Sequence, residues 1–81
     1  MANQSKAVWM LSAKGYHLKC NVDPYKPLVN QLKNQYSEAF GVSPGSLILR
    51  FDGEEMEEQD TFDSLDMVEH DIIDVLEFTW N

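Results

Sequence analysis

The spacing of apolar residues near the start of the chain predicts a pair of strands. The segment AVWMLSA (residues 7–13) is a short apolar run. The segment YHLKCNV (residues 16–22) alternates between apolar and polar side chains, which places one set on a single face: Tyr16, Leu18, Cys20 and Val22. Lys14 and Gly15 separate the two segments in the manner of a tight turn. The pattern therefore predicts a β-hairpin.

The apolar spacing then changes to that of a helix. Asp23-Pro24 interrupts the second strand, and a helix is predicted from about Pro27 to Phe40, with Pro27 in the first turn, where its missing N–H is not needed. The predicted buried stripe repeats at intervals of about four residues and contains Leu28, Val29, Leu32, Tyr36 (or Ala39) and Phe40. Gly41 follows as a C-terminal stop.

The second half of the chain contains two further strand patterns and an acidic connection. Strands are predicted at Leu47–Phe51 and Ile72–Phe78, with a turn at Asp52-Gly53, a short edge strand around Met56, and a short helical turn at Thr61–Leu65. Strands around a single helix are typical of an α+β fold, in which the helix lies across one face of the sheet.

Length and composition indicate one domain. The chain has 81 residues, of which 43% are hydrophobic, as in an ordinary small globular domain. We expect residues 1–6 to form a disordered tail and residues 7–80 to form the domain. Cys20 is the only cysteine, so no disulfide framework or zinc cluster is expected, and a reducing compartment is favoured. No apolar run is long enough for a membrane span, and the N-terminus lacks the apolar centre of a signal peptide.

Charge is divided sharply between the two halves of the chain. The net charge is −8; residues 1–50 carry a balance of +4, whereas residues 51–81 carry twelve carboxylates and no Lys or Arg. An acidic half repels nucleic acid and anionic membranes, so neither is expected as a partner, and a basic protein is favoured instead. A surface charge that only maintains solubility is the simpler alternative.

Catalytic and metal sites find little support in the sequence. His17 lies three residues from Cys20, but on a strand the two side chains point to opposite faces. His17 and His70 have no metal-ligand spacing. We therefore expect no enzyme activity and no cofactor, and we interpret Cys20 as a buried structural thiol and Trp9 and Phe62 as aromatic residues of the core or its edge.

Three segments resemble SUMO within the ubiquitin-like β-grasp fold: YSEAFGV (36–42), SLILRFDGE (46–54) and TFDSLDMVEHDIIDV (61–75). The resemblance implies a mixed sheet of four to five strands with one main helix packed across it. Conjugated modifiers end in Gly-Gly, whereas this sequence ends Phe78-Thr79-Trp80-Asn81, which is similar to the SUMO-like domains embedded in the RENi family of genome-stability proteins. That similarity implies a non-conjugated interaction domain of a larger nuclear protein, acting in genome maintenance or the SUMO pathway.

The resemblance also implies a docking surface for the SUMO E2 conjugating enzyme. In SUMO this surface crosses the third and last strands, and the positions that correspond here are Asp52, Glu69 and Asp71, with Glu54 nearby and Arg50 in the adjoining sheet. Carboxylates held on a sheet can pair with Arg and Lys of a basic partner and speed the encounter. Arg50 stands where ubiquitin has its main apolar contact residue, so ubiquitin-type receptors are expected to be excluded. Glu55, Glu57 and Glu58 are interpreted as solubilising charges.

A second surface implied by the resemblance is the groove between the second strand and the helix, where SUMO accepts SUMO-interacting peptides. The residues that correspond to its rim and opening are His17, Leu18, Lys19 and Lys33, and its wall would include Leu18, Cys20, Leu32 and Tyr36. The alternative is that these apolar residues belong to the core.

An alternative function on the same fold is an oligomerisation module of the PB1 type, in which an acidic cluster of one partner binds a basic patch of another. Asp52-Gly53-Glu54-Glu55 fits the acidic PB1 signature only loosely, because that signature needs closely spaced aspartates before a longer helix. We therefore expect a monomer.

Overall fold

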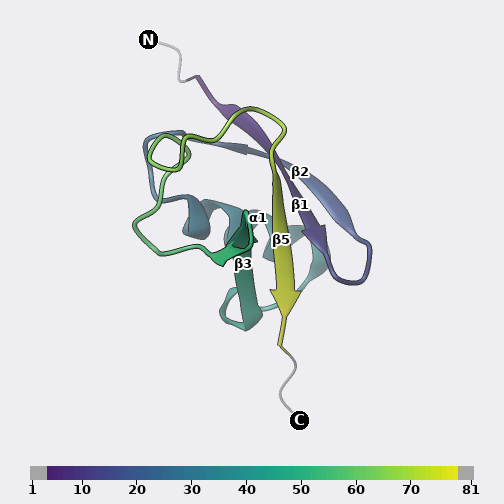
Figure 1. Cartoon of the computed structure of the whole chain (residues 1–81). Coiled ribbons are helices and arrows are strands. Elements are labelled where there is room, and N and C mark those ends of the chain that lie inside the picture. The colour runs from purple at the N-terminus through teal and green to yellow at the C-terminus, as the bar shows by residue number, and fades with distance from the viewer. Residues whose placement is uncertain (1–3, 79–81) are drawn as a thin grey trace.

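A computed structural model describes residues 4–78 of the chain (Figure 1). The elements in chain order are β1 (Lys6–Ser12), β2 (His17–Val22), α1 (Leu28–Phe40), the 3-10 turn η1 (Pro44–Ser46), β3 (Leu47–Phe51), β4 (Glu54–Glu55) and β5 (Ile72–Glu77). The strands form one 5-stranded sheet in the order β2-β1-β5-β3-β4, in which β1 and β5 run parallel and the other neighbours run antiparallel. The predicted α+β fold, with the helix across one face of a mixed sheet, is confirmed.

The predicted hairpin of β1 and β2 is present. Val8 lies opposite Cys20 and Met10 opposite Leu18. Gly15 adopts a φ of 91°, a left-handed conformation that costs glycine no steric strain. β1 begins at Lys6, so this residue, which the sequence placed in a disordered tail, is the first residue of the sheet. Residues 1–3 of the predicted tail and residue 80 of the predicted domain boundary lie outside the described residues.

The helix begins one residue later than predicted. Pro27 has a φ of −52° and a ψ of 124°, so it precedes the helix as its N-cap and is not part of the first turn. The N–H of Leu28 donates to the Asp60 carbonyl at 2.8 Å, so this N–H, which has no acceptor within the helix, gains one from a distant loop. At the other end Gly41 has a φ of 70° and donates to the Ser37 carbonyl, as the predicted stop requires.

The core lies between α1 and the inner face of the sheet. The helix buries Leu28, Val29, Leu32 and Tyr36, while the strands contribute buried side chains at alternate positions: Val8, Met10, Cys20, Val22, Leu47, Leu49, Ile73 and Val75. The predicted stripe is wrong at its last position, because Phe40 is 38% exposed. Its ring packs on Tyr36 and stacks on Tyr16, at centroid distances of 4.7 and 5.5 Å, and so closes the end of the core.

The acidic connection between β3 and β5 is built from turns. Asp52 and Gly53 both have positive φ, 56° and 82°, which is the geometry of a two-residue hairpin turn between β3 and β4. The short edge strand is Glu54–Glu55, and Met56 is buried directly after it. The predicted helical turn is a turn of residues 62–66, in which Thr61 Oγ1 accepts the Ser64 N–H at 2.9 Å and Phe62 is buried.

The described residues have neither a membrane-spanning helix nor a cluster of metal ligands. Between residues 4 and 78, no helix has the length and apolar character needed to cross a bilayer. The same residues contain no group of three or more His, Cys, Asp or Glu side chains arranged to hold a metal ion.

Candidate interaction surfaces

The face of the sheet opposite α1 is not covered by any described element, and we call it the open face. Strand alternation places on it every second residue of each strand. Its main members are His17 and Lys19 of β2, Trp9 and Leu11 of β1, Ile72 and Asp74 of β5, Arg50 of β3 and Glu55 of β4.

Four predicted docking carboxylates gather at one end of the sheet, which we call the acidic end: Asp52, Glu54, Glu69 and Asp71. Because β3 and β5 are antiparallel, with Arg50 opposite Asp74, the last residues of β3 and the first residues of β5 meet at this end. Asp52 occupies the turn that leaves β3, and Asp71 immediately precedes β5. The structure therefore brings together residues that are far apart in the sequence.

Two of these carboxylates are fixed by the backbone of the same region. Glu69 Oε2 accepts the Ala7 N–H at 3.2 Å, and Asp71 Oδ2 accepts the Val68 N–H at 2.9 Å. His70 between them has a φ of 72°, and its N–H donates to the Ala7 carbonyl at 2.7 Å. Each carboxylate uses one oxygen in this way and has a second oxygen for a partner.

Arg50 is exposed on the open face beside the acidic end. Its neighbours on the adjoining strands are Asp74 of β5 and Glu55 of β4. Within residues 4–78, the only ion pair within 4.0 Å joins Lys26 to Asp23, at 3.9 Å, so a structural salt bridge does not occupy the Arg50 guanidinium. Arg50 is thus placed to contribute a cation to a surface that is otherwise acidic.

The predicted peptide groove does not have the composition that the sequence suggested. Cys20, Leu32 and Tyr36 are completely buried, so they belong to the core and line no open groove. His17 and Lys19 alternate with Leu18 and lie on the open face, so the basic rim and the apolar wall of β2 are on opposite sides of the strand. Lys33 is on α1.

The outer edge of β2 is also partly occupied. Gln35 of α1 donates from Nε2 to the Asn21 carbonyl at 2.9 Å, which uses one acceptor of the strand edge. An incoming peptide strand would need such acceptors for its own backbone.

Cys20 lacks the environment of a reactive thiol. Burial raises its pKa from 9.0 to about 11, so the thiolate is strongly disfavoured at neutral pH. The ring of His17 lies against Trp9 on the other side of the strand, at a centroid distance of 5.8 Å. These two residues therefore form no nucleophile–base pair.

The PB1 alternative also loses support. Its acidic signature requires a longer helix after the glycine, whereas the segment between Gly53 and Ile72 forms β4 and a series of turns. This geometry favours the SUMO-type reading of the same carboxylates.

Comparison with known proteins identifies the family. The family model described as "Ubiquitin-2 like Rad60 SUMO-like" matches residues 7–76, which is most of the chain. The chain belongs to this SUMO-like family. Its structure is similar to ubiquitin from Caldiarchaeum subterraneum, with a TM-score of 0.85 and 16% sequence identity over 96% of this chain and 99% of that one. No curated protein sequence matches significantly. The ubiquitin-like β-grasp fold is confirmed, and the SUMO-like resemblance with it.

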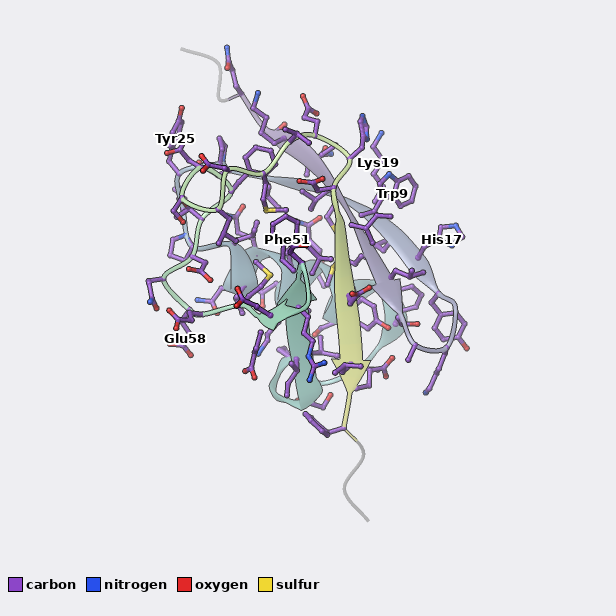
Figure 2. All side chains as sticks on the ribbon, viewed as in Figure 1. Trp9, His17, Lys19, Tyr25, Phe51 and Glu58 are labelled. Carbon is purple, nitrogen blue, oxygen red and sulfur yellow. The ribbon has the colours of Figure 1, made fainter. Side chains whose placement is uncertain are left out.

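The SUMO-like domain has one surface feature that the sequence analysis missed. Trp9, interpreted there as a residue of the core or its edge, lies partly exposed on the open face (Figure 2), next to Leu11 and Ile72, which are 39% and 55% exposed. With Met10 and His17 these residues line a shallow apolar hollow. The sequence contains a signal for this surface. Ala7, Trp9 and Leu11 occupy alternate positions of β1 and are all apolar, whereas an exposed face ordinarily carries polar residues.

Proposed function

We propose that this SUMO-like domain docks noncovalently on the SUMO E2 conjugating enzyme through the acidic end of its sheet and Arg50. The observation that carries the proposal is the convergence of Asp52, Glu54, Glu69 and Asp71 at the end of the sheet where β3 finishes and β5 begins. A SUMO-like β-grasp domain is a protein-interaction module, and the sequence resemblance described above supports the E2 as its partner.

The acidic end has the properties that favour recognition of a basic protein surface. Glu69 and Asp71 are held by backbone N–H groups, so their free oxygens lose little conformational entropy when they pair with Arg or Lys. The net charge of −8 adds long-range attraction for a basic partner, which acts mainly on the association rate and weakens as salt is added.

We further propose that the domain serves a larger nuclear protein of genome maintenance or the SUMO pathway. The sequence resemblance described above supports this assignment. Imaging of the tagged full-length protein tests the location: a signal confined to the cytoplasm would contradict it.

Titration calorimetry with purified SUMO E2 tests the docking site. The informative variant is Glu54→Arg, because Glu54 is exposed on the short edge strand and accepts no hydrogen bond within residues 4–78. Its reversal should weaken binding by about 10-fold or more, as expected for a charge in a complementary contact. Glu58→Arg is the matched control, since Glu58 is also exposed and its reversal changes the net charge equally, but it lies in the loop after β4 (Figure 2).

Asp71→Arg provides a second variant at the other side of the acidic end. It also removes the acceptor of the Val68 N–H, so a denaturation curve must show that the variant is folded at the assay temperature. Equal losses for Glu54→Arg, Asp71→Arg and Glu58→Arg would indicate nonspecific attraction, and no binding by the unmodified domain would contradict the proposal itself.

A further inference from the structure

We infer that the E2 contact continues from the acidic end across the open face into the hollow formed by Trp9, Leu11 and Ile72, with Trp9 as its apolar anchor. This inference rests on the proposed function and extends it, since the residues named for docking so far are all charged.

The hollow is a shallow concave surface of the open face with a mainly apolar lining. It has a volume of about 320 Å³ and is lined by Trp9, Met10, Leu11, His17 and Ile72. Trp9 and Ile72 are register partners on adjacent strands, so their side chains emerge about 5 Å apart on the same face. Because α1 already covers the inner face, the stability of the fold gives no reason to place large apolar side chains here.

Hydrogen bonds join the strand that carries the hollow to the acidic end. The Trp9 N–H donates to the Asp71 carbonyl at 2.8 Å, and the Ala7 carbonyl and N–H bond to His70 and Glu69. Ile72 follows Asp71 directly in the chain. The hollow therefore lies next to the start of β5, where the backbones of Trp9 and Asp71 are joined directly.

The arrangement has the composition of an interaction hot spot. Such sites are enriched in Trp and lie in apolar pockets surrounded by polar groups. Here Asp71 directly precedes Ile72 of the hollow in the chain, His17 of β2 lines the hollow, and Lys19 lies opposite Trp9 in register (Figure 2). The occupant should present an apolar side chain, with a basic group toward Asp71 and an oxygen acceptor toward Lys19.

A second copy of the same chain is the less favoured occupant. Each copy carries a net charge of −8, which opposes close association of two domains. The E2 is preferred because the acidic end beside the hollow attracts a basic partner.

Calorimetric titration of the E2 with Trp9→Ala tests the inference. We expect binding to weaken by about 30-fold or more, as for a central tryptophan hot spot. Tyr25→Ala is the matched control, because Tyr25 is an aromatic residue that is 76% exposed in the loop between β2 and α1, and its loss should leave the affinity within about twofold. Ile72→Ser, at an exposed position of the same hollow, should also weaken binding and replaces Trp9→Ala if that variant fails to fold.

The outcomes separate this inference from the proposed function. If the unmodified domain does not bind the E2, the proposed function and the inference both fail. If it binds, and Glu54→Arg weakens binding while Trp9→Ala and Ile72→Ser do not, only the inference is overturned. Sedimentation that detects a dimer of the free domain, abolished by Trp9→Ala with E2 binding unchanged, would assign the hollow to a second copy and also overturn it.

Discussion

The two faces of the sheet use the same strands for different purposes. On β1, Val8, Met10 and Ser12 point toward α1 and are buried, whereas Trp9 and Leu11 alternate with them and face outward. Apolar residues on the inner face are explained by the helix that covers them. Apolar residues on the open face have no such cover, so their presence indicates a partner more directly than the much larger set of core residues does.

The largest expected effect is the difference in stability between a variant on the inner face of the sheet and a variant on its open face. Leu32 is completely buried on α1, so Leu32→Ala should lower the free energy of unfolding by about 2–5 kcal/mol through lost burial and a residual cavity. Ile72→Ala on the open face should change it by less than about 1 kcal/mol, since the side chain is 55% exposed. Urea denaturation monitored by circular dichroism measures both. Similar losses for the two variants would mean that the open face contributes to the core.

A smaller effect is expected at the hydrogen bond between the buried side of α1 and the end of β5. The Tyr36 hydroxyl donates to Glu77 Oε2 at 2.8 Å and so joins the buried side of α1 to the end of β5. Tyr36→Phe should lower the free energy of unfolding by about 1–2 kcal/mol, because a hydrogen bond to a carboxylate is lost while the ring remains packed. Glu77→Gln is the control that keeps an acceptor in place. A Tyr36→Phe variant as stable as the original domain would show that water replaces this bond without cost.

The loss of stability at alkaline pH tests how completely the inner face of the sheet is shielded from solvent. Folding raises the pKa of Cys20 from 9.0 to about 11 by burial, so between these values the unfolded chain loses a proton that the folded chain retains. Stability should therefore be unaffected below pH 9 and fall as the pH rises toward about 11. Burial, and then the bond to Glu77, also raise the pKa of Tyr36, which acts in the same direction.

Cys20→Ala isolates this contribution. The free energy of unfolding, obtained from denaturation curves across the alkaline range, should fall less steeply with pH for this variant than for the original domain. Adding Tyr36→Phe should reduce the remaining slope further. An unchanged slope would show that the thiol titrates equally in both states. Thiol-reagent labelling at neutral pH should also be slow in the folded domain; fast labelling would revive a reactive role for Cys20.

Most of the fold could be predicted from residue patterns. The alternation at residues 16–22, the four-residue spacing from Leu28 to Tyr36 and the Asp52-Gly53 turn each specify local geometry strongly. The helix end at Phe40 was predicted correctly, but Pro27 precedes the helix and the Phe40 side chain is 38% exposed. These two details depend on distant partners, namely the Asp60 carbonyl that accepts the Leu28 N–H and the Tyr16 ring that stacks on Phe40.

The candidate surfaces were less predictable than the fold. The positions of Asp52 and Asp71 came from a family resemblance, and only the antiparallel pairing of β3 with β5 places them at one end. His17 and Lys19 were assigned to a groove, although alternation with Leu18 already indicated the opposite face. Trp9 was overlooked because an apolar residue in a strand is ordinarily core, and the sequence does not say which face a helix leaves uncovered.

An NMR titration of the isotope-labelled domain with the SUMO E2 tests the central claim most directly. The account predicts shifts concentrated at Arg50, Asp52, Glu54, Glu69 and Asp71 and continuing to Trp9 and Ile72 on the open face, with Lys33 and its neighbours on α1 unaffected. Shifts confined to Leu18, Lys33 and the rest of the β2–α1 side, or no shifts at all, would contradict it.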